Sequence, residues 1–213
     1  MPNLFAATLG QRPEAITVAL DELHGVVPVP VVGVVEPGAR AAAERCGNRP
    51  IAVIGTEATV GSGAYTRAIH AIRSDAHVIA QACPLFVPIV EEGRESDDPV
   101  VAITAEDYLA PLRAAGVGTV VLGCTHYPLL REAIVRCLGN DVEIIDSGRE
   151  TPRVVQALLA ETDRLSRGGA PGSMRCYVSD NPARFRRVGS RFLKHEIEHV
   201  EQVEPEHYIT PAL

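Results

Sequence analysis

The fold class follows from one stretch, Val117-Gly118-Thr119-Val120-Val121-Leu122-Gly123-Cys124-Thr125-His126-Tyr127-Pro128. Residues 117–123 form a nearly continuous apolar run, which is typical of a β-strand covered on both faces. Pro128 suits the first turn of a helix, so a helix is predicted over residues 128–138. The stretch therefore predicts one strand–loop–helix unit of an α/β fold.

The same pattern recurs along the chain. Short apolar runs alternate with helical segments, which predicts parallel βαβ units. Prolines exclude a regular helix at 84–88, and residues 91–99 are interpreted as an acidic loop. Further strands are predicted at 29–35, 51–55, 77–81 and 142–146, and helices at 39–46, 65–72, 103–115 and 152–165. After a linker-like segment at 167–173, a strand (175–179), a helix (182–195) and a strand (199–203) follow.

The composition indicates a folded protein without a nucleic-acid partner. Of the 213 residues, 46% are hydrophobic and 22% are charged, a balance that disordered chains lack. The length fits one large domain or two small ones. A net charge of −7 would repel a phosphate backbone. The basic run Arg184-Phe185-Arg186-Arg187 is interpreted as a solvated helix face, with an anion or nucleic-acid patch as the alternative.

The cysteines and the chain start indicate a cytoplasmic protein. The five cysteines are odd in number, widely spaced and without a CxxC pair, so free thiols in a reducing compartment are expected. The first residues lack the pattern of a signal peptide. No apolar run approaches the roughly 18 residues of a membrane span, so no membrane association is expected.

Cys124 is the strongest candidate for chemistry. It is placed between a strand and a helix start, where the helix dipole and free backbone N–H groups favour a thiolate. His126, two residues on, could act as the neighbouring base or proton carrier. The alternative is a buried cysteine that behaves as a small hydrophobic residue.

Two further strand-end loops could contribute to the same site. Residues 55–63 offer hydroxyl and N–H groups suited to an anion, although Thr59 or Ser62 could instead cap a helix. The loop matches neither a Walker A nor a GxGxxG pattern, so nucleotide binding is unsupported. Glu91 follows the apolar run at 87–90 and could face a cleft, or could be a solvated loop acid.

A metal site is not expected. His195-Glu196-Ile197-Glu198-His199 matches HExxH, but that motif requires a helix through both histidines, and residues 197–203 read as a strand. Cys124 with His126 lacks a third ligand. The other thiols are interpreted as structural, namely Cys46, Cys83, Cys137 and Cys176.

Taken together, these loops resemble the glutamate racemases of the cofactor-independent aspartate/glutamate racemase superfamily. The resemblance covers residues 18–203, and Gly-Cys-Thr-His-Tyr-Pro at 123–128 is its most specific motif. The other matching segments are Pro-Val-Val-Gly-Val-Val-Glu-Pro-Gly-Ala at 30–39, Ile-Gly-Thr-Glu-Ala-Thr at 54–59, Val-Pro-Ile-Val-Glu at 87–91, Ile-Asp-Ser-Gly at 145–148 and the helix at 185–198.

The resemblance implies two flavodoxin-like parallel-sheet domains that face a cleft. Residues 33–145 would form the second domain, and residues 1–32 with 146–213 an incomplete first domain. It further implies interconversion of L- and D-glutamate without a cofactor, for peptidoglycan synthesis, and a possible homodimer. In the family, two cysteines transfer the proton. The resemblance assigns catalytic roles to Cys124, His126 and Glu91, and substrate binding to Thr125, His126, Thr56 and Thr59.

The sequence departs from the family at its start. Family members carry Asp-Ser-Gly, Tyr-Gly and Cys-Asn-Thr-Ala in their first segment, and none of these is present; no cysteine precedes Cys46. We therefore expect a truncated chain or a misplaced start, and no racemisation by the chain as written. The alternatives are a catalytically inactive ligand- or protein-binding relative, and another cofactor-free racemase or lyase.

Overall fold

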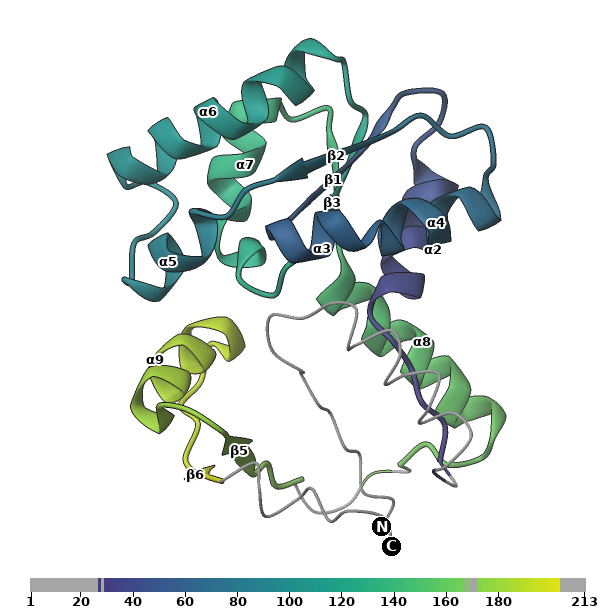
Figure 1. The fold of residues 1–213 in the computed structure, drawn as a ribbon. Helices are drawn as coiled ribbons and strands as arrows, with labels where there is room; N and C mark the ends of the chain where they lie inside the picture. The colour runs from purple at the N-terminus through teal and green to yellow at the C-terminus, as the bar shows by residue number, and fades with distance from the viewer. Residues whose placement is uncertain (1–26, 28, 167, 169–171, 204–213) are drawn as a thin grey trace, which may run out of the picture.

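A four-stranded parallel sheet forms the centre of the protein (Figure 1). The computed structural model describes residues 27, 29–166, 168 and 172–203. The strand order is β2-β1-β3-β4. The strands are β1 (Ile51–Gly55), β2 (Val78–Ala82), β3 (Thr119–Leu122) and β4 (Glu143–Asp146). The predicted strands at 51–55, 77–81, 117–123 and 142–146 are thus confirmed, the first with the same bounds and the others with bounds shifted by at most two residues.

Helices cover both faces of this sheet, as the apolar strands predicted. On one face, α2 (Val35–Arg45) and α4 (Ala64–Ile72) pack against Ile51 and Val53. On the other, α6 (Pro99–Ala114) and α7 (Arg131–Leu138) pack against Ala52 and Ile54. Successive side chains of β1 point to opposite faces, so the strand is buried throughout. The fold is therefore α/β, with two apolar layers around the sheet.

Three short helices lie where the strands end. They are α3 (Glu57–Ser62) after β1, α5 (Phe86–Glu91) after β2, and the 3₁₀ helix η1 (Tyr127–Leu130) after β3. Because the carboxyl ends of parallel strands share one edge of the sheet, these helices and their loops are neighbours. This edge is where the candidate site is located.

The C-terminal elements continue from the same edge (Figure 1). Helix α8 (Ser147–Glu161) begins directly after β4, and the parallel pair β5 (Cys176–Val178) and β6 (Val200–Gln202) is joined by α9 (Pro182–Leu193). Helix α9 lies beside α5 (Figure 1). The predicted strand–helix–strand order after the linker-like segment is confirmed.

Three local predictions are wrong. Residues 29–34 form no strand, and Val29 and Val34 are exposed; Pro30 has no N–H group to donate to a sheet. The helix predicted from residue 39 begins at Val35 instead, with Pro37 in its first turn, where no N–H group is needed. The exclusion of a helix at 84–88 also fails, because residues 86–91 are helical. Pro88 occupies the first turn of α5, where no N–H group is needed for a hydrogen bond within the helix.

Candidate active site

Cys124 lies just beyond the end of β3, on a backbone held close to β1. The N–H group of Gly123 donates a hydrogen bond of 2.8 Å to the carbonyl of Ile54. A Cβ atom at position 123 would lie 3.0 Å from that carbonyl oxygen and 3.3 Å from Cγ2 of Thr59. Glycine therefore permits the close approach that places Cys124 beside the loop after β1.

The Cys124 thiol is half-buried and adjoins His126. Its Sγ lies 3.8 Å from Nδ1 of His126. Burial raises the pKa of the Cys124 thiol, and the backbone N–H groups of His126 and Tyr127 oppose this rise. The thiol is therefore protonated at neutral pH, whereas the sequence favoured a thiolate. The reason is that only the short η1 begins here, so desolvation outweighs the N–H groups.

His126 connects Cys124 to Glu91. Its Nε2 lies 3.2 Å from Oε1 of Glu91, the last residue of α5. Burial lowers the pKa of His126, so the imidazole is neutral. A neutral ring that donates from Nε2 to the carboxylate leaves Nδ1 as an acceptor facing the thiol. The arrangement can thus move the Cys124 proton to and from His126.

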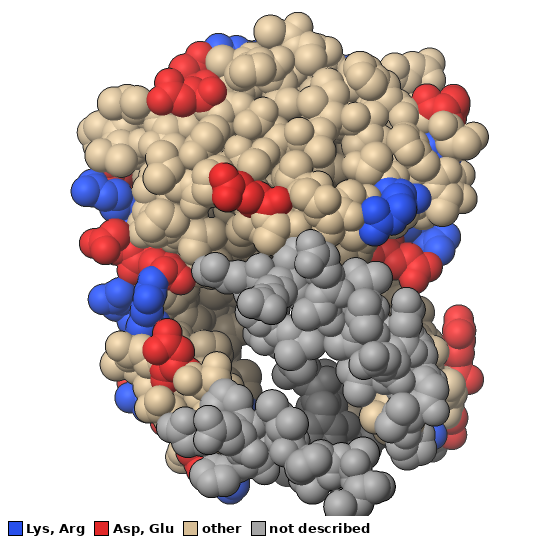
Figure 2. Space-filling model, in the orientation of Figure 1, with Lys and Arg blue, Asp and Glu red and all other residues tan. Residues whose placement is uncertain are grey.

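Glu91 is also held from the opposite side by α9. Arg184 forms an ion pair with Oε2 of Glu91, and Nη2 of Arg187 donates a 2.8 Å hydrogen bond to the Glu91 carbonyl. In Figure 2, basic and acidic side chains meet where α9 faces α5. The run at 184–187 is exposed, as the interpretation of a solvated helix face expects, but Arg184 and Arg187 also contact the neighbouring helix α5. Sequence reasoning names both residues in the basic run but assigns neither to the site. With Arg191 they form a row at i, i+3 and i+7, a spacing that indicates a shared helix face.

The predicted substrate-binding threonines lie on the same edge of the sheet. Thr56 caps α3 by accepting the N–H of Thr59 at 3.2 Å, and the two hydroxyl oxygens are 3.0 Å apart. Thr59, in turn, lies against the Gly123 backbone. Thr125 is exposed, with its hydroxyl 3.5 Å from Nδ1 of His126. Thr56 is therefore the cap of α3. Ser62, one of the two residues in the capping alternative, accepts the N–H of Ala64 at the start of α4 at 3.2 Å, whereas Thr59 lies within α3 and caps no described helix.

Two tyrosines missed by sequence reasoning pack near the Cys124 loop. Tyr65 directs its hydroxyl to Oγ of Ser147 at 2.9 Å, and its ring would lie 3.2 Å from a Cβ atom at Gly123. Tyr127 is fully buried and donates to the carbonyl of Cys83 at 2.8 Å. The first bond ties α4 to the start of α8, and the Tyr65 ring packs beside Gly123. The second ties η1, directly after the Cys124 loop, to the residue that follows β2.

The HExxH segment does not form the helix that its motif needs. Helix α9 ends at Leu193, Lys194 has a left-handed backbone with φ 57°, and β6 begins at Val200. Nowhere in the described ranges do three or more His, Cys, Asp or Glu side chains form a group that could hold a metal ion. Of the described helices, none has the length and apolar character to cross a membrane.

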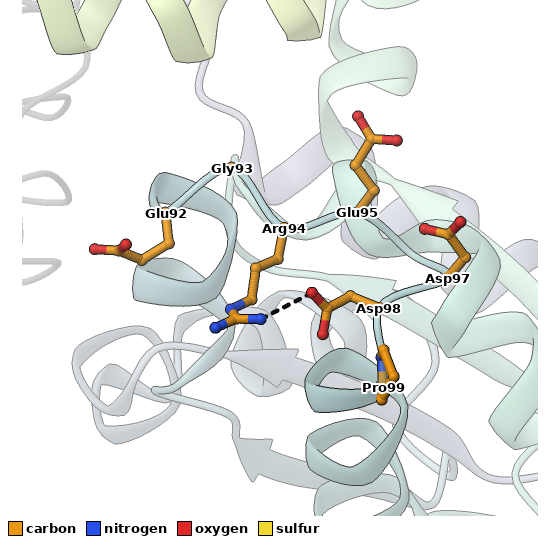
Figure 3. A pocket seen from close by; sticks show the side chains of 7 residues that line it. All are labelled: Glu92, Gly93, Arg94, Glu95, Asp97, Asp98 and Pro99. Atoms are coloured by element: carbon orange, nitrogen blue, oxygen red, sulfur yellow. Dashed lines mark hydrogen bonds and ion pairs between the residues drawn. The ribbon is translucent and has the colours of Figure 1, made fainter.

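A separate open hollow follows α5 on the chain (Figure 3). Arg94 in this hollow pairs with Asp98 at 2.8 Å, and the carboxylates of Glu95 and Asp97 point away from that pair (Figure 3). Its lining contains none of the predicted site residues and is mainly acidic: Glu92, Gly93, Arg94, Glu95, Asp97, Asp98 and Pro99. Such a lining repels an anionic ligand, so this hollow is a poor candidate for a dicarboxylate site.

Known proteins share both the sequence and this arrangement of elements. The glutamate racemase of Geobacter metallireducens is 47% identical over 185 residues, which are 87% of this chain and 68% of the relative. A solved glutamate racemase isoform from Bacillus anthracis matches with a TM-score of 0.81 and 34% identity, covering 90% of this chain and 71% of that one. The Francisella tularensis enzyme, solved in complex with D-glutamate, has a TM-score of 0.78 and 33% identity, covering 87% and 68%.

The chain thus spans about two thirds of the length of these relatives. The model of the Asp/Glu/Hydantoin racemase family matches residues 15–155, which include α2 to β4 and the candidate site. The chain belongs to the Asp/Glu/Hydantoin racemase family.

Proposed function

We propose that this chain is part of a glutamate racemase, in which Cys124 exchanges the α-proton on one face of glutamate. The observation that carries the proposal is the contact series from Cys124 through His126 to Glu91. An α-proton is weakly acidic, so an acid/base group needs a poised neighbour to take up or supply its proton. The close relatives named above act on the same substrate.

Cys124 would act as acid in one direction and as base in the other. As a thiol it donates its proton to the α-carbanion and becomes a thiolate. In reverse, Nδ1 of His126 accepts the thiol proton, and the resulting thiolate removes the α-proton, so that an S–H bond forms as the C–H bond breaks. The N–H groups of His126 and Tyr127, which lower the thiol pKa, stabilise the thiolate stage. Glu91 stabilises the imidazolium that His126 then becomes.

The threonine hydroxyls would orient the substrate. Thr56 and Thr59 follow β1, and Thr125 follows β3, so their hydroxyls flank the Cys124 loop. Hydroxyl groups can donate to carboxylates and accept from the α-ammonium group. We assign these three residues to binding glutamate, with no cofactor required.

Inversion of the α-carbon also needs an acid/base group on the opposite face, and the family resemblance implies a second cysteine there. The 213 residues contain no Cys-Asn-Thr-Ala segment. Residues 33–145 would then be the domain that carries Cys124, and residues 1–32 with 146–213 the other. The complete activity would supply D-glutamate for peptidoglycan in a bacterial cytoplasm, as a homodimer. The chain as given would exchange one enantiomer without racemising it.

Proton NMR in D₂O tests this proposal. The α-proton signal should disappear for one enantiomer of glutamate only, while circular dichroism shows no conversion of D- to L-glutamate. The one-face proposal would be contradicted if the α-proton signals of both enantiomers disappeared, D-glutamate were converted to L-glutamate, and Cys124→Ala abolished the exchange and the conversion. Persistence of both signals would contradict proton exchange by Cys124.

A second candidate is a catalytically inactive glutamate-binding relative. Burial raises the pKa of the Cys124 thiol and so opposes its use as a base, while the hydroxyls of Thr56, Thr59 and Thr125 could still bind the ligand. The distinguishing measurement is calorimetry with L- and D-glutamate alongside the exchange experiment. Binding without exchange by either enantiomer supports this candidate, whereas exchange of one enantiomer supports the racemase proposal.

A further inference from the structure

Helix α9 contacts the end of α5 through one row of arginines. Arg184, Arg187 and Arg191 are spaced at i, i+3 and i+7, so they lie on the same face of α9. Nη1 of Arg191 donates to the carbonyl of Val90 at 2.9 Å, next to the Arg187 contact with the Glu91 carbonyl. These bonds fix the last turn of α5 against a helix that comes about a hundred residues later in the chain (Figure 1).

Within this contact the Glu91 carboxylate has two partners, one on each oxygen. Oε1 faces Nε2 of His126 at 3.2 Å, and Oε2 is paired with Arg184. The guanidinium group therefore offsets the negative charge that His126 would otherwise experience. In the part of the chain that the structure describes, Arg187 and Arg191 on α9 contact the backbone at Glu91 and Val90, and Cys124 lies beyond His126. Glu92 and Arg94 are the nearest charged residues along the chain.

We propose that Arg184 is a positioning residue, which holds and partly neutralises Glu91 so that His126 stays uncharged and able to accept the Cys124 proton. The inference rests on the proposed function in assigning acid/base work to Cys124. It links the C-terminal β5–α9–β6 unit to the proton-transfer group, because Arg184 comes from that unit and Glu91 from the sheet domain.

The experiment follows the imidazole of His126 by NMR titration in the full chain. The ring signal is assigned by its absence in His126→Gln. In Arg184→Gln the carboxylate loses its cationic partner, so we expect the pKa of His126 to rise by about one pH unit. Arg184→Lys keeps the charge and should return the titration to that of the parent protein. Arg186→Gln is the matched control, because Arg186 is exposed on the same helix outside the arginine row.

A double substitution tests whether the effect passes through Glu91. If it does, Arg184→Gln should not change the His126 titration in a Glu91→Gln background. An unchanged or lowered pKa in Arg184→Gln, or the same rise in the Glu91→Gln background, would overturn the proposal. The Arg184 side chain is 48% exposed, so its replacement removes little buried packing, and circular dichroism checks that each variant is folded.

This measurement needs no turnover, so it separates the two proposals. If the parent protein exchanges no α-proton, the proposed function fails while the His126 titration still reports on Arg184. If exchange occurs, the pH profile of the exchange rate should shift upward in Arg184→Gln together with the titration, and Arg184→Lys should restore it.

Discussion

Nε2 of His126 lies 3.2 Å from Oε1 of Glu91, although 35 residues separate them in the chain. The contact joins the loop after β3 to the end of α5. Both side chains are only 23% exposed, which strengthens their electrostatic coupling relative to a surface pair. Through this contact a carboxylate influences the ring that faces the Cys124 thiol.

Glu91→Gln is expected to slow α-proton exchange by about 10²-fold, a typical contribution of assisted proton transfer. The amide can still fill the space, but it neither fixes the His126 tautomer nor stabilises an imidazolium. Exchange in D₂O followed by NMR measures the effect. The adjacent, exposed Glu92 provides the control, since Glu92→Gln should exchange at the parent rate. Equal slowing in both variants would contradict a specific role for Glu91.

Cys124→Ala is expected to abolish the α-proton exchange that the parent protein shows with one enantiomer, because no group remains to carry the proton to the α-carbon. Cys176→Ala is the matched control: Cys176 is a free, partly exposed cysteine in β5, and its loss should leave the exchange rate unchanged. Exchange that survives in Cys124→Ala would show that another residue is the base.

The sheet could be predicted from the sequence because its strands are buried on both faces. The runs at 51–55 and 117–123 read as continuous apolar segments, and every residue of β1 and β3 is buried. The run at 29–35 has the same composition but forms no strand, since apolar content alone does not supply a neighbouring strand. Pro88 led to the opposite error, because a proline in the first turn of a helix lacks no N–H group that the helix needs.

The candidate site could be predicted only in its local part. Cys124 and His126 are two residues apart, so their proximity follows from the sequence. Glu91 was assigned through the family resemblance, and its contact with His126 depends on how the chain returns at the sheet edge. The role of Arg184 could not be predicted, because the sequence of a polar helix face does not indicate which carboxylate its arginines will pair with.

Acidification should destabilise the protein in part through His126. Burial lowers the folded-state pKa of His126 below its ordinary value of 6.5, so the unfolded chain binds this proton more readily. The stability contribution is complete above about pH 6.5 and is lost as the pH falls toward the folded-state pKa. We expect the free energy of unfolding in urea to fall less between about pH 8 and about pH 5.5 in His126→Gln than in the parent. Equal decreases would contradict this.

Gly123→Ala should destabilise the fold and disturb the site together. The added Cβ would lie 3.0 Å from the Ile54 carbonyl oxygen and 3.2 Å from Cε2 of Tyr65, and backbone and a buried ring have little room to move. Overpacking of this kind costs about 1–3 kcal/mol, measured by urea unfolding. Gly61→Ala is the control, because that helical position has no atom within 4 Å of its Cβ and alanine favours a helix by about 0.5–1 kcal/mol. If both variants unfold at the same urea concentration, the close approach of β3 to β1 does not require glycine.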